Sequence, residues 1–456
     1  MTDKTNILPI YKRIIYLFIV GSFTAVWLLY YNNYAFRTHL KLGAIFSILI
    51  FWLLYYYFSR VYGAFKIATY SIPETVFSQI LSFGLADLIL WIECCLVYRQ
   101  PVSLWPGLLC AAVQIAGVIV LVVLAKNYFI HHVKPSDALI VYGRSDSDVF
   151  RAKLEKKYSH MFYFREAVSC REPAEKLWQK INQYPVIFLF NISTDARKKL
   201  MEYCTGHGKQ VYITPRAEDL IMQGFSYRML IDTPVMKYEY YYDDPVKLFV
   251  KRLLDIIFSV LFLGILSPIF VGTMIAIKAE DGGPIFFRQK RCTKNEKVFN
   301  IIKFRSMKEN ADRPGEVNPY RTDDERVTKV GRFIRRFRID ELPQFLNILK
   351  GDMSIVGPRP ERIEHVRKFD EIVPEFRYRS RVKAGLTGYG QIYGKYNTSP
   401  YDKALWDLAY IENQSVIEDI KIVFLTFKAV FVPESTEGFD ASVDIVKMKP
   451  TDKTDT

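Results

Sequence analysis

Asp340 and Glu341 form an adjacent carboxylate pair, in a stretch that also holds Arg359 between two prolines. Pro343 suits a helix only in its first turn, so the sequence predicts that the pair lies where a short helix begins. Asp340 then falls near the N-cap, where unpaired N–H groups and the positive end of the helix dipole favour a phosphate group. The alternative is that Asp340 only caps this helix. The pair alone does not decide between the two.

The helix after the pair is predicted from its apolar face and its two ends. Phe345, Ile348 and Leu349 fall on one face of a helix, and Lys350 suits the negative charge of its last turn. Gly351 follows as a left-handed stop. These residues predict a short helix packed on a core.

Basic residues precede the pair on two predicted elements. Residues 299–304 read as the second strand of a hairpin, with Lys303 and Arg305 on one face. Residues 307–320 are polar and lack periodicity, which predicts a mobile loop. Residues 330–337 then place four apolar side chains on one helical face with arginines around it, Arg335 among them. This pattern predicts a helix lying in the membrane interface, with a surface helix packed on the protein core as the alternative.

A hydrophobic segment over residues 253–277 is interrupted near its middle by Ser267 and Pro268. Proline removes a backbone hydrogen bond and kinks a helix. Basic residues flank both ends of the segment, as expected if it enters and leaves a membrane on the same side. We therefore expect a re-entrant helix, with a kinked span as the alternative.

Four further apolar runs precede this region, each near the length that spans about 30 Å of hydrocarbon: residues 14–31, 42–58, 76–98 and 104–125. They predict a four-helix transmembrane domain over residues 1–130. With the N-terminus inside, seven basic residues lie on the inner side and three on the outer, which favours both ends in the cytosol. Asp87 and Glu93 interrupt the third run. Acidic residues at membrane depth are functional candidates, and the alternative is that both have only structural roles.

Residues 134–236 alternate short apolar runs with polar helical stretches. Strands are expected at residues 138–142, 186–190 and 210–213, with helices over 150–157 and 195–203. The alternation predicts a parallel, Rossmann-like α/β domain. Gly143 begins the first turn, but the other glycines of a dinucleotide fingerprint are absent. A regulatory or self-association role is therefore expected rather than a cofactor site.

The 456 residues are half apolar and suffice for two or three domains. The net charge of +14 fits a membrane surface and phosphate-bearing substrates, and no nucleic-acid-binding motif accompanies it. The six cysteines show neither metal spacing nor a disulfide framework, so we expect reduced packing residues: Cys94, Cys95, Cys110, Cys170, Cys204 and Cys292.

Several ordered motifs resemble the bacterial sugar transferase domain of monotopic phosphoglycosyl transferases. They are KRLLDIIFS, FFRQKR, KFRSM, the block from DDERVTKVGRF through RIDELPQFLNILKGDMSIVGPRP, and AGLTGYGQIYGKYN. The resemblance covers residues 247–433 and implies a catalytic α/β domain with a re-entrant helix. The preceding spans and α/β module resemble the large members of the family, the polyprenyl-phosphate hexose-1-phosphate transferases.

The resemblance implies transfer of a hexose-1-phosphate from a UDP-sugar to undecaprenyl phosphate with release of UMP, starting exopolysaccharide, capsule or O-antigen synthesis. Asp340 is the implied nucleophile, and Glu341, with Asp340, helps to hold Mg²⁺. Lys303, Arg335 and Arg359 match basic positions around the phosphates. The family has Gly-Arg-Asn where this chain has Gly394-Lys395-Tyr396-Asn397, so Lys395 is expected to act there as a point charge rather than a planar fork.

The sequence thus predicts an enzyme in the bacterial cytoplasmic (inner) membrane, with its catalytic domain facing the cytosol. Its expected partners are the lipid bilayer and a second copy in a homodimer, and nucleic acid is not among them. Residues 434–456 are polar and predict a disordered tail. The alternative function is a membrane-anchored nucleotide-sugar-binding or sensor protein without turnover.

Overall fold

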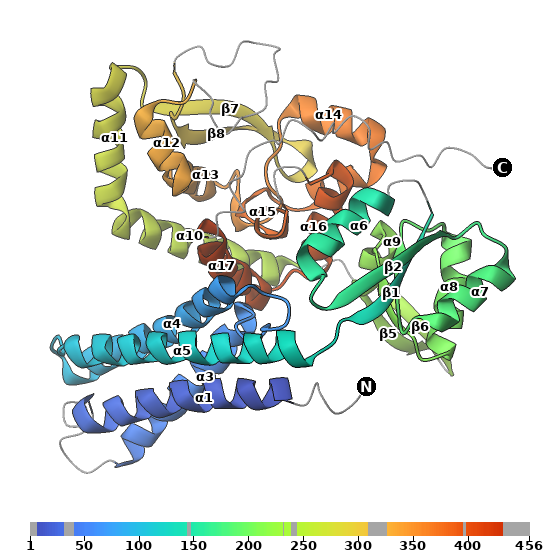
Figure 1. Cartoon of the computed structure of the whole chain (residues 1–456). Coiled ribbons are helices and arrows are strands. Elements are labelled where there is room, and N and C mark those ends of the chain that lie inside the picture. The colour runs from blue at the N-terminus through green and yellow to red at the C-terminus, as the bar shows by residue number, and fades with distance from the viewer. Residues whose placement is uncertain are drawn as a thin grey trace. The chain divides into compact units, whose positions relative to one another are not determined.

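The computed structural model describes residues 7–31, 41–143, 147–230, 232–238, 244–308, 326–394 and 398–431. The chain divides into two compact units, Met1–Thr214 and Pro215–Thr456 (Figure 1). The tail expected over 434–456, most of the loop expected over 307–320, and Lys395 lie outside the described residues.

The first unit begins with four long apolar helices. Each is long and apolar enough to cross a membrane, as the sequence predicts: α1 (Ile7–Val26) with a π-helical turn (Trp27–Tyr31), α3 (Lys41–Val61), α4 (Ile72–Tyr98) and α5 (Trp105–His132).

Aromatic and polar contacts join these helices. The rings of Phe23 and Phe51 stack with their centroids 3.7 Å apart. The Tyr55 hydroxyl donates to the Gln79 side chain at 2.7 Å. Of the two acidic residues, Glu93 accepts a long hydrogen bond of 3.4 Å from Ser47. One carboxylate oxygen of Asp87 is buried without a partner among the described residues.

A four-stranded parallel sheet follows, with strand order β2-β1-β3-β4. Its elements in chain order are β1 (Ser136–Tyr142), α6 (Ser147–Tyr158), β2 (Phe162–Ser169), α7 (Ala174–Gln183), β3 (Val186–Phe190), α8 (Thr194–Gly206) and β4 (Gln210–Ile213). The three expected strands and both expected helices are present. The sequence did not predict β2, whose apolar alternation is broken by Arg165 and Glu166.

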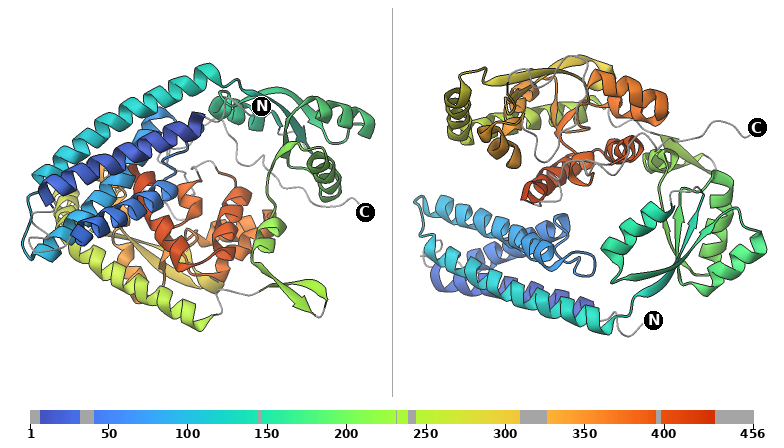
Figure 2. Two further views of the ribbon diagram at one scale, coloured as in Figure 1. Left: turned by 90° about the horizontal axis from the view of Figure 1, so that it is seen from below. Right: turned by 45° about the horizontal axis from the view of Figure 1, so that its top comes forward.

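Alternate residues of these strands face opposite sides of the sheet. Leu139 and Val141 pack with α7 and α8, while Ala138 and Ile140 pack toward α6. Figures 1 and 2 show the helices covering both faces. Because both faces are covered, the strands read as short, nearly continuous apolar runs.

The second unit begins earlier than the predicted end of the α/β domain at residue 236. Helix α9 (Ala217–Gln223) buries Ala217 and Leu220 against α16 (Pro400–Glu412). An antiparallel hairpin of β5 (Phe225–Leu230) and β6 (Thr233–Tyr238) follows, and the Tyr238 hydroxyl donates to Glu412 at 2.6 Å. Residues 217–238 therefore pack with the second unit.

Two helices, α10 (Pro245–Ile265) and α11 (Ser267–Asp281), are bent by 62° at the break predicted by Ser267 and Pro268 (Figure 1). Pro268 stands in the first turn of α11, where its missing N–H costs no hydrogen bond. The Ser267 hydroxyl donates to the Gly264 carbonyl at 2.8 Å, satisfying a carbonyl at the end of α10. The geometry fits a broken span or a re-entrant helix equally.

The remaining elements of the second unit are short. They are β7 (Phe286–Cys292), a 3₁₀ turn η3 (Lys294–Glu296), β8 (Val298–Phe304), α12 (Lys329–Arg336), a 3₁₀ turn η4 (Ile339–Glu341), α13 (Gln344–Lys350), β9 (Ser354–Val356), α14 (Ile363–Ile372), the 3₁₀ segment η5 (Pro374–Arg381), β10 (Gly385–Thr387), α15 (Tyr389–Ile392), α16 and α17 (Val416–Phe431). Strands β7 and β8 form the predicted antiparallel hairpin, and β9 pairs with β10 in parallel.

The core of this unit gathers around β9. Ile348 of α13, Met353, Ile411 of α16 and Ile422 of α17 are all fully buried there.

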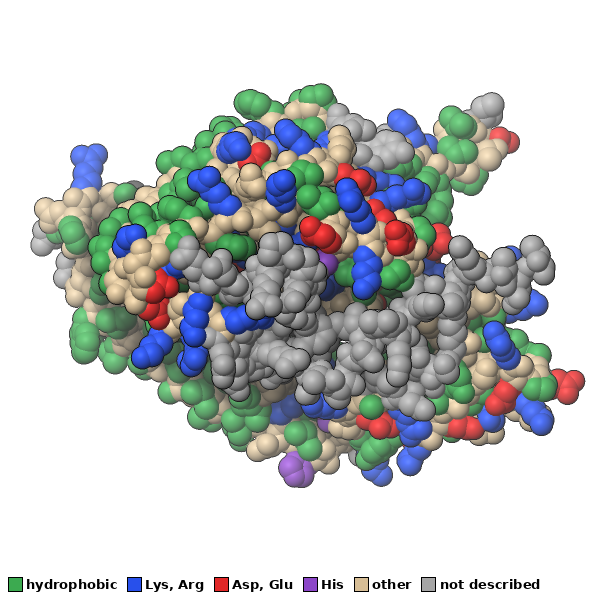
Figure 3. All heavy atoms as spheres, turned by 90° about the horizontal axis from the view of Figure 1, so that it is seen from above, with side chains coloured by type: hydrophobic (Ala, Val, Ile, Leu, Met, Phe, Trp, Pro, Cys, Tyr) green, Lys and Arg blue, Asp and Glu red, His purple; other side chains and the backbone are tan. Residues whose placement is uncertain are grey.

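On the face drawn in Figure 3, basic side chains are interspersed with acidic and hydrophobic ones. Among the described side chains of that face, the positive charge is therefore not gathered into one continuous patch.

Candidate active site

The carboxylate pair lies in the 3₁₀ turn η4, ahead of helix α13 rather than at its N-cap. The expectation that Asp340 lies near the N-cap is wrong, because Pro343 occupies that position. Pro343 has no N–H to reach back to Ile339, so the Ile339 carbonyl accepts from the Leu342 N–H at 3.1 Å instead. Arg338, at φ 55°, redirects the chain into this turn. The predicted Gly351 stop is confirmed, with φ 95°.

Glu341 is the paired carboxylate of the two. It is buried, and one oxygen, Oε1, accepts from Lys303 Nζ at 2.8 Å and from Arg359 Nη2 at 3.2 Å. Burial favours the neutral acid, but the charges of Lys303 and Arg359 outweigh it and hold the pKa of Glu341 below its usual range. Glu341 is therefore a fixed negative charge that orders two cations.

Asp340 is the unpaired carboxylate. Within the described part of the chain, no hydrogen bond or ion pair reaches its side chain. Burial raises its pKa, the Lys303 charge opposes the rise, and Glu341 adds to it. Successive residues of a 3₁₀ turn point about 120° apart, so the two carboxylates point in different directions. Asp340 is thus the more basic member and has its oxygens available.

Arg359 is held by its backbone while its side chain stays 44% exposed. The carbonyls before, at and after it each accept a hydrogen bond. Pro358 accepts from Gly385 N at 2.8 Å, Arg359 from Arg379 Nη2 at 2.8 Å, and Pro360 from Arg291 Nη1 at 3.1 Å. The segment is therefore rigid by contact as well as by its prolines, and the guanidinium is available to a ligand.

Two residues that the sequence analysis did not single out hold the backbone at Arg359 in place. Arg379 is buried and also pairs with Asp407 at 2.8 Å. Arg291 is held beside Gln289, whose side chain accepts from it at 2.6 Å. Burial lowers the pKa of Arg291 to about 10. Their contacts with residues 359 and 360 could not be predicted from local sequence, because these partners lie far away in the chain.

Asn347 was also missed, although the sequence carries a signal for it. It interrupts the apolar face of α13 and is buried in the structure. Its amide donates to the Asn300 carbonyl at 2.8 Å, and its carbonyl oxygen accepts from Ile302 N at 2.9 Å. Asn347 thereby pairs with the free edge of β8 and places Lys303 beside η4.

The other predicted basic residues fall in different places. Arg335, in the last turn of α12, lies close enough for its charge to favour ionised Asp340. Arg305 lies beyond the end of β8 and pairs with Asp281 at the end of α11. Arg305 is therefore part of the scaffold.

The predicted apolar face of helix α12 is only partly buried against the protein. Ile334 is buried with Ile277 and Phe304. Phe333 and Phe337 remain 59% and 41% exposed. One side of the helix packs on the core, and two aromatic rings on the other are available to an apolar medium.

The site as a whole suits a ligand that carries phosphate. A free carboxylate lies beside a fixed one, with Lys303, Arg335 and Arg359 around them. No group of three or more His, Cys, Asp or Glu side chains in the described residues is arranged to hold a metal ion. Mg²⁺ commonly uses only one or two carboxylates together with substrate phosphates, so a larger cluster is not required for a magnesium site.

Comparison with known proteins gives the same picture. The model of the family described as bacterial sugar transferase matches residues 246–433. The UDP-N-acetylgalactosamine-undecaprenyl-phosphate N-acetylgalactosaminephosphotransferase of Aeromonas hydrophila is 42% identical over 189 residues, 41% of this chain and 44% of that protein. The UDP-glucose:undecaprenyl-phosphate glucose-1-phosphate transferase of Escherichia coli (strain K12) is 42% identical over 199 residues, 42% of this chain and 43% of that protein.

A shorter relative is covered almost throughout. The exopolysaccharide production protein ExoY of Sinorhizobium fredii is 41% identical over 194 residues, 40% of this chain and 84% of that protein. The matches to the first two relatives span less than half of their length. The chain belongs to the bacterial sugar transferase family.

Proposed function

We propose that this protein transfers a hexose-1-phosphate from a UDP-sugar to undecaprenyl phosphate, releasing UMP, as an initiating step of polysaccharide synthesis. The observation that carries the proposal is the division of the carboxylate pair. Asp340 has free oxygens and a raised pKa, whereas Glu341 is bound by two cations. The relatives, named as transferases of a sugar phosphate to undecaprenyl phosphate from UDP-N-acetylgalactosamine or UDP-glucose, supply the substrate class.

The proposed reaction has two displacements at one phosphorus. An Asp340 oxygen attacks the phosphorus that bears the sugar, and the bond from that phosphorus to the bridging oxygen breaks, so that UMP leaves with the electron pair. A phosphate oxygen of the acceptor then attacks the same phosphorus and displaces Asp340. The first step forms an acyl phosphate on Asp340, and the second step regenerates the carboxylate. Two such steps through a covalent intermediate predict ping-pong kinetics.

The cations have separate tasks in this scheme. Arg359, whose guanidinium is exposed, suits binding of the donor's diphosphate. Lys303 keeps Glu341 ionised, and Arg335 favours the ionised form of Asp340. Glu341, with Asp340, would hold Mg²⁺, which when bound neutralises charge on the diphosphate.

The bent helix pair accounts for how two different substrates reach one carboxylate. We propose that α10 and α11 form a re-entrant helix on the cytosolic side of the inner membrane. Exposed apolar residues on both arms support contact with lipid, including Val260 at 58% and Ile275 at 64% exposure. The basic residues that flank both ends of the segment favour entry and exit on the same side. The site then lies at headgroup depth, where a soluble nucleotide sugar and a lipid phosphate both arrive.

Purified full-length protein should release UMP from one of a panel of UDP-sugars when undecaprenyl phosphate and Mg²⁺ are present. Asp340→Asn should abolish release, because an amide is a poor nucleophile, while a surface change such as Lys290→Met should not. Full activity of Asp340→Asn would show that the nucleophile is elsewhere. No release from any UDP-sugar would favour the binding or sensor alternative.

A further inference from the structure

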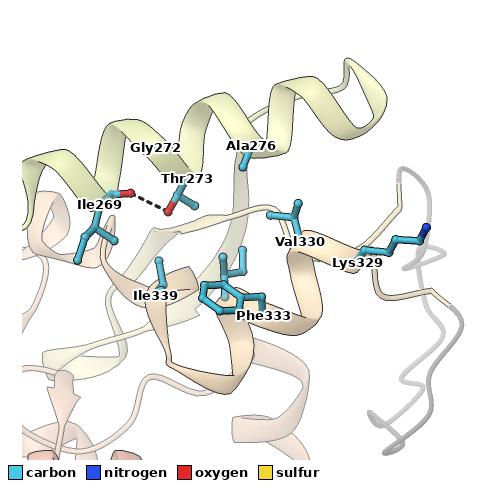
Figure 4. Close-up of a pocket in the computed structure, with 9 residues that line it drawn as sticks. Ile269, Gly272, Thr273, Ala276, Lys329, Val330, Phe333 and Ile339 are labelled. Atoms are coloured by element: carbon cyan, nitrogen blue, oxygen red, sulfur yellow. Dashed lines mark hydrogen bonds between the residues drawn. The ribbon is translucent and has the colours of Figure 1, made fainter.

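An apolar groove of about 490 Å³ runs between α11 and α12 beside the site (Figure 4). Helix α11 lines it with Ile269, Gly272, Thr273 and Ala276, which share one helical face. Helix α12 contributes three apolar side chains, and the Ile339 side chain enters from η4. The groove is thus built from both helices and from the turn that carries the carboxylates.

The walls of the groove offer little to a polar ligand. The Thr273 hydroxyl donates to the Ile269 carbonyl of its own helix at 2.7 Å, so its hydrogen is already used. Lys329 is the charged residue among those lining it, and its side chain points away from the groove (Figure 4). A hydrocarbon is therefore the ligand that these walls favour.

The two ends of the groove differ. At one end, the Glu280 carboxylate of α11 accepts from the backbone N–H groups of Lys329 and Val330, at 2.7 Å and 3.3 Å. This contact ties α11 to the start of α12. At the other end lies Ile339, and the next residue is Asp340. A chain lying in the groove therefore ends at the turn that carries Asp340.

We propose that this groove binds the first isoprene units of the lipid acceptor, next to its phosphate. The inference rests on the proposed function, because it takes a polyprenyl phosphate as the acceptor. Continuity selects this occupant: a molecule with an apolar chain in the groove and a phosphate at the chain's end brings that phosphate to η4, the turn that carries the two carboxylates. At roughly 30 Å³ per carbon atom, about that of a liquid water molecule, the volume holds on the order of three isoprene units.

Small residues of α11 keep the groove open. A Cβ atom added at Gly272 meets nothing within 4 Å, so a larger side chain there enters the groove without displacing backbone. Leucine also favours a helix more than glycine does. Gly272→Leu therefore fills the groove while leaving the helix intact. Val271, 53% exposed and outside the groove, gives the matched control Val271→Leu.

The test measures both half-reactions of the full-length protein in lipid nanodiscs. We expect Gly272→Leu to raise KM roughly tenfold for a polyprenyl phosphate of several isoprene units, the size of effect that a small steric change in an apolar pocket produces. KM for a single-isoprene phosphate should rise less, because one isoprene unit fills only part of the groove. Release of UMP in the first half-reaction should also persist, and Val271→Leu should behave as the wild type does.

Three outcomes would overturn the proposal. The first is an unchanged KM for the long acceptor, as expected if bulk phospholipid or a second copy of the chain occupies the groove. The second is an equal rise in KM for both acceptors. The third is loss of the first half-reaction in a variant that is still folded. Ala276→Leu repeats the test at a second position. Failure of the wild type to release UMP from any UDP-sugar would contradict the proposed function itself, and is distinct from these results.

Discussion

At the scale of single residues, the site separates one charge that is fixed from one that is free. Glu341 and Lys303 form a largely buried pair at 2.8 Å, and Arg359 adds a second contact at 3.2 Å. A buried carboxylate that loses a partner retains the cost of being out of water. Loss of any one of these three side chains therefore destabilises the other two, and it also changes the charges that surround Asp340.

Lys303→Met should lower both stability and turnover. It leaves Glu341 with Arg359 alone, so we expect a loss of about 2 kcal/mol in the free energy of unfolding. We also expect a roughly hundredfold lower rate of UMP release, comparable to loss of one charge-stabilising donor. Urea unfolding and a UMP-release assay measure the two effects. Lys290→Met, on the exposed side of β7, is the control, and equal behaviour of the two variants would contradict the assigned role.

Glu361 makes the stability of the second unit depend on pH. Burial by itself would raise its pKa, but the hydrogen bond with His365 and the charge of Arg379 lower it to about 2 from an ordinary 4.5. A lowered folded-state pKa contributes stability above pH 4.5, which is lost as the pH falls toward 2. The difference corresponds to about 3 kcal/mol.

Unfolding of the solubilised protein between pH 7 and pH 3 tests this contribution. The wild type should lose stability through that window, and Glu361→Gln should show a shallower loss, because the glutamine does not titrate. Parallel pH profiles for the two proteins would mean that Glu361 contributes nothing. Glu361 lies two residues after Arg359, so the turnover of the Glu361→Gln variant should be measured as well.

At the scale of elements, close backbone approaches set the position of η4. Gly331 of α12 lies against the Ser306 carbonyl, and an added Cβ would collide with that oxygen. The Thr328 hydroxyl caps the same helix by accepting from Gly331 N at 2.9 Å. Helix α12 is thereby fixed to the end of the β7–β8 hairpin, and the carboxylate turn follows it directly in the chain.

Gly331→Ala should therefore displace α12 and weaken the enzyme, although alanine favours helices. We expect a cost of roughly 1–3 kcal/mol, as for overpacking elsewhere, together with reduced UMP release. Gly264→Ala is the matched control, since a Cβ there meets nothing within 4 Å. Circular-dichroism melting and the activity assay compare them, and an unaffected Gly331→Ala would contradict the proposed docking of α12.

An element could be predicted from the sequence where the residues that determine it lie next to it in the chain. Pro343 and Gly351 bound α13 correctly, and Ser267 with Pro268 locate the bend, because proline and glycine act through the backbone beside them. The 3₁₀ turn was not predicted, since it depends on the Ile339 carbonyl finding a new donor. The supports from Arg379 and Arg291 were not predictable either. Their partners are distant in sequence and appear only in the fold.

At the scale of the whole molecule, the chain combines four candidate spans, a parallel sheet and a family domain that begins with a bent helix pair. The boundary of the second unit shows the limit of composition as a guide. Residues 217–223 fall within the α/β domain predicted over residues 134–236, yet the apolar face of helix α9 packs on α16. Which side of the membrane each part occupies is a separate prediction.

Labelling of single cysteines in intact cells tests that prediction, in a chain whose six native cysteines are replaced. Gln100→Cys, between α4 and α5, should react with an impermeant maleimide from outside. Lys247→Cys, in the first turn of α10, and Lys290→Cys, after the end of α11, should react only after permeabilisation. If these two positions differ from each other, α10 and α11 cross the membrane. If both react from outside, the proposed orientation is reversed.

The central claim is that Asp340 forms a covalent bond to the phosphosugar, and trapping that intermediate tests it most directly. Wild-type protein, incubated with its UDP-sugar and Mg²⁺ without acceptor, should gain the mass of one hexose phosphate less one water on the peptide containing Asp340. The mass should disappear when undecaprenyl phosphate is added, and Asp340→Asn should never acquire it. A labelled Asp340→Asn, or UMP release by the wild type without any covalent adduct, would contradict the account.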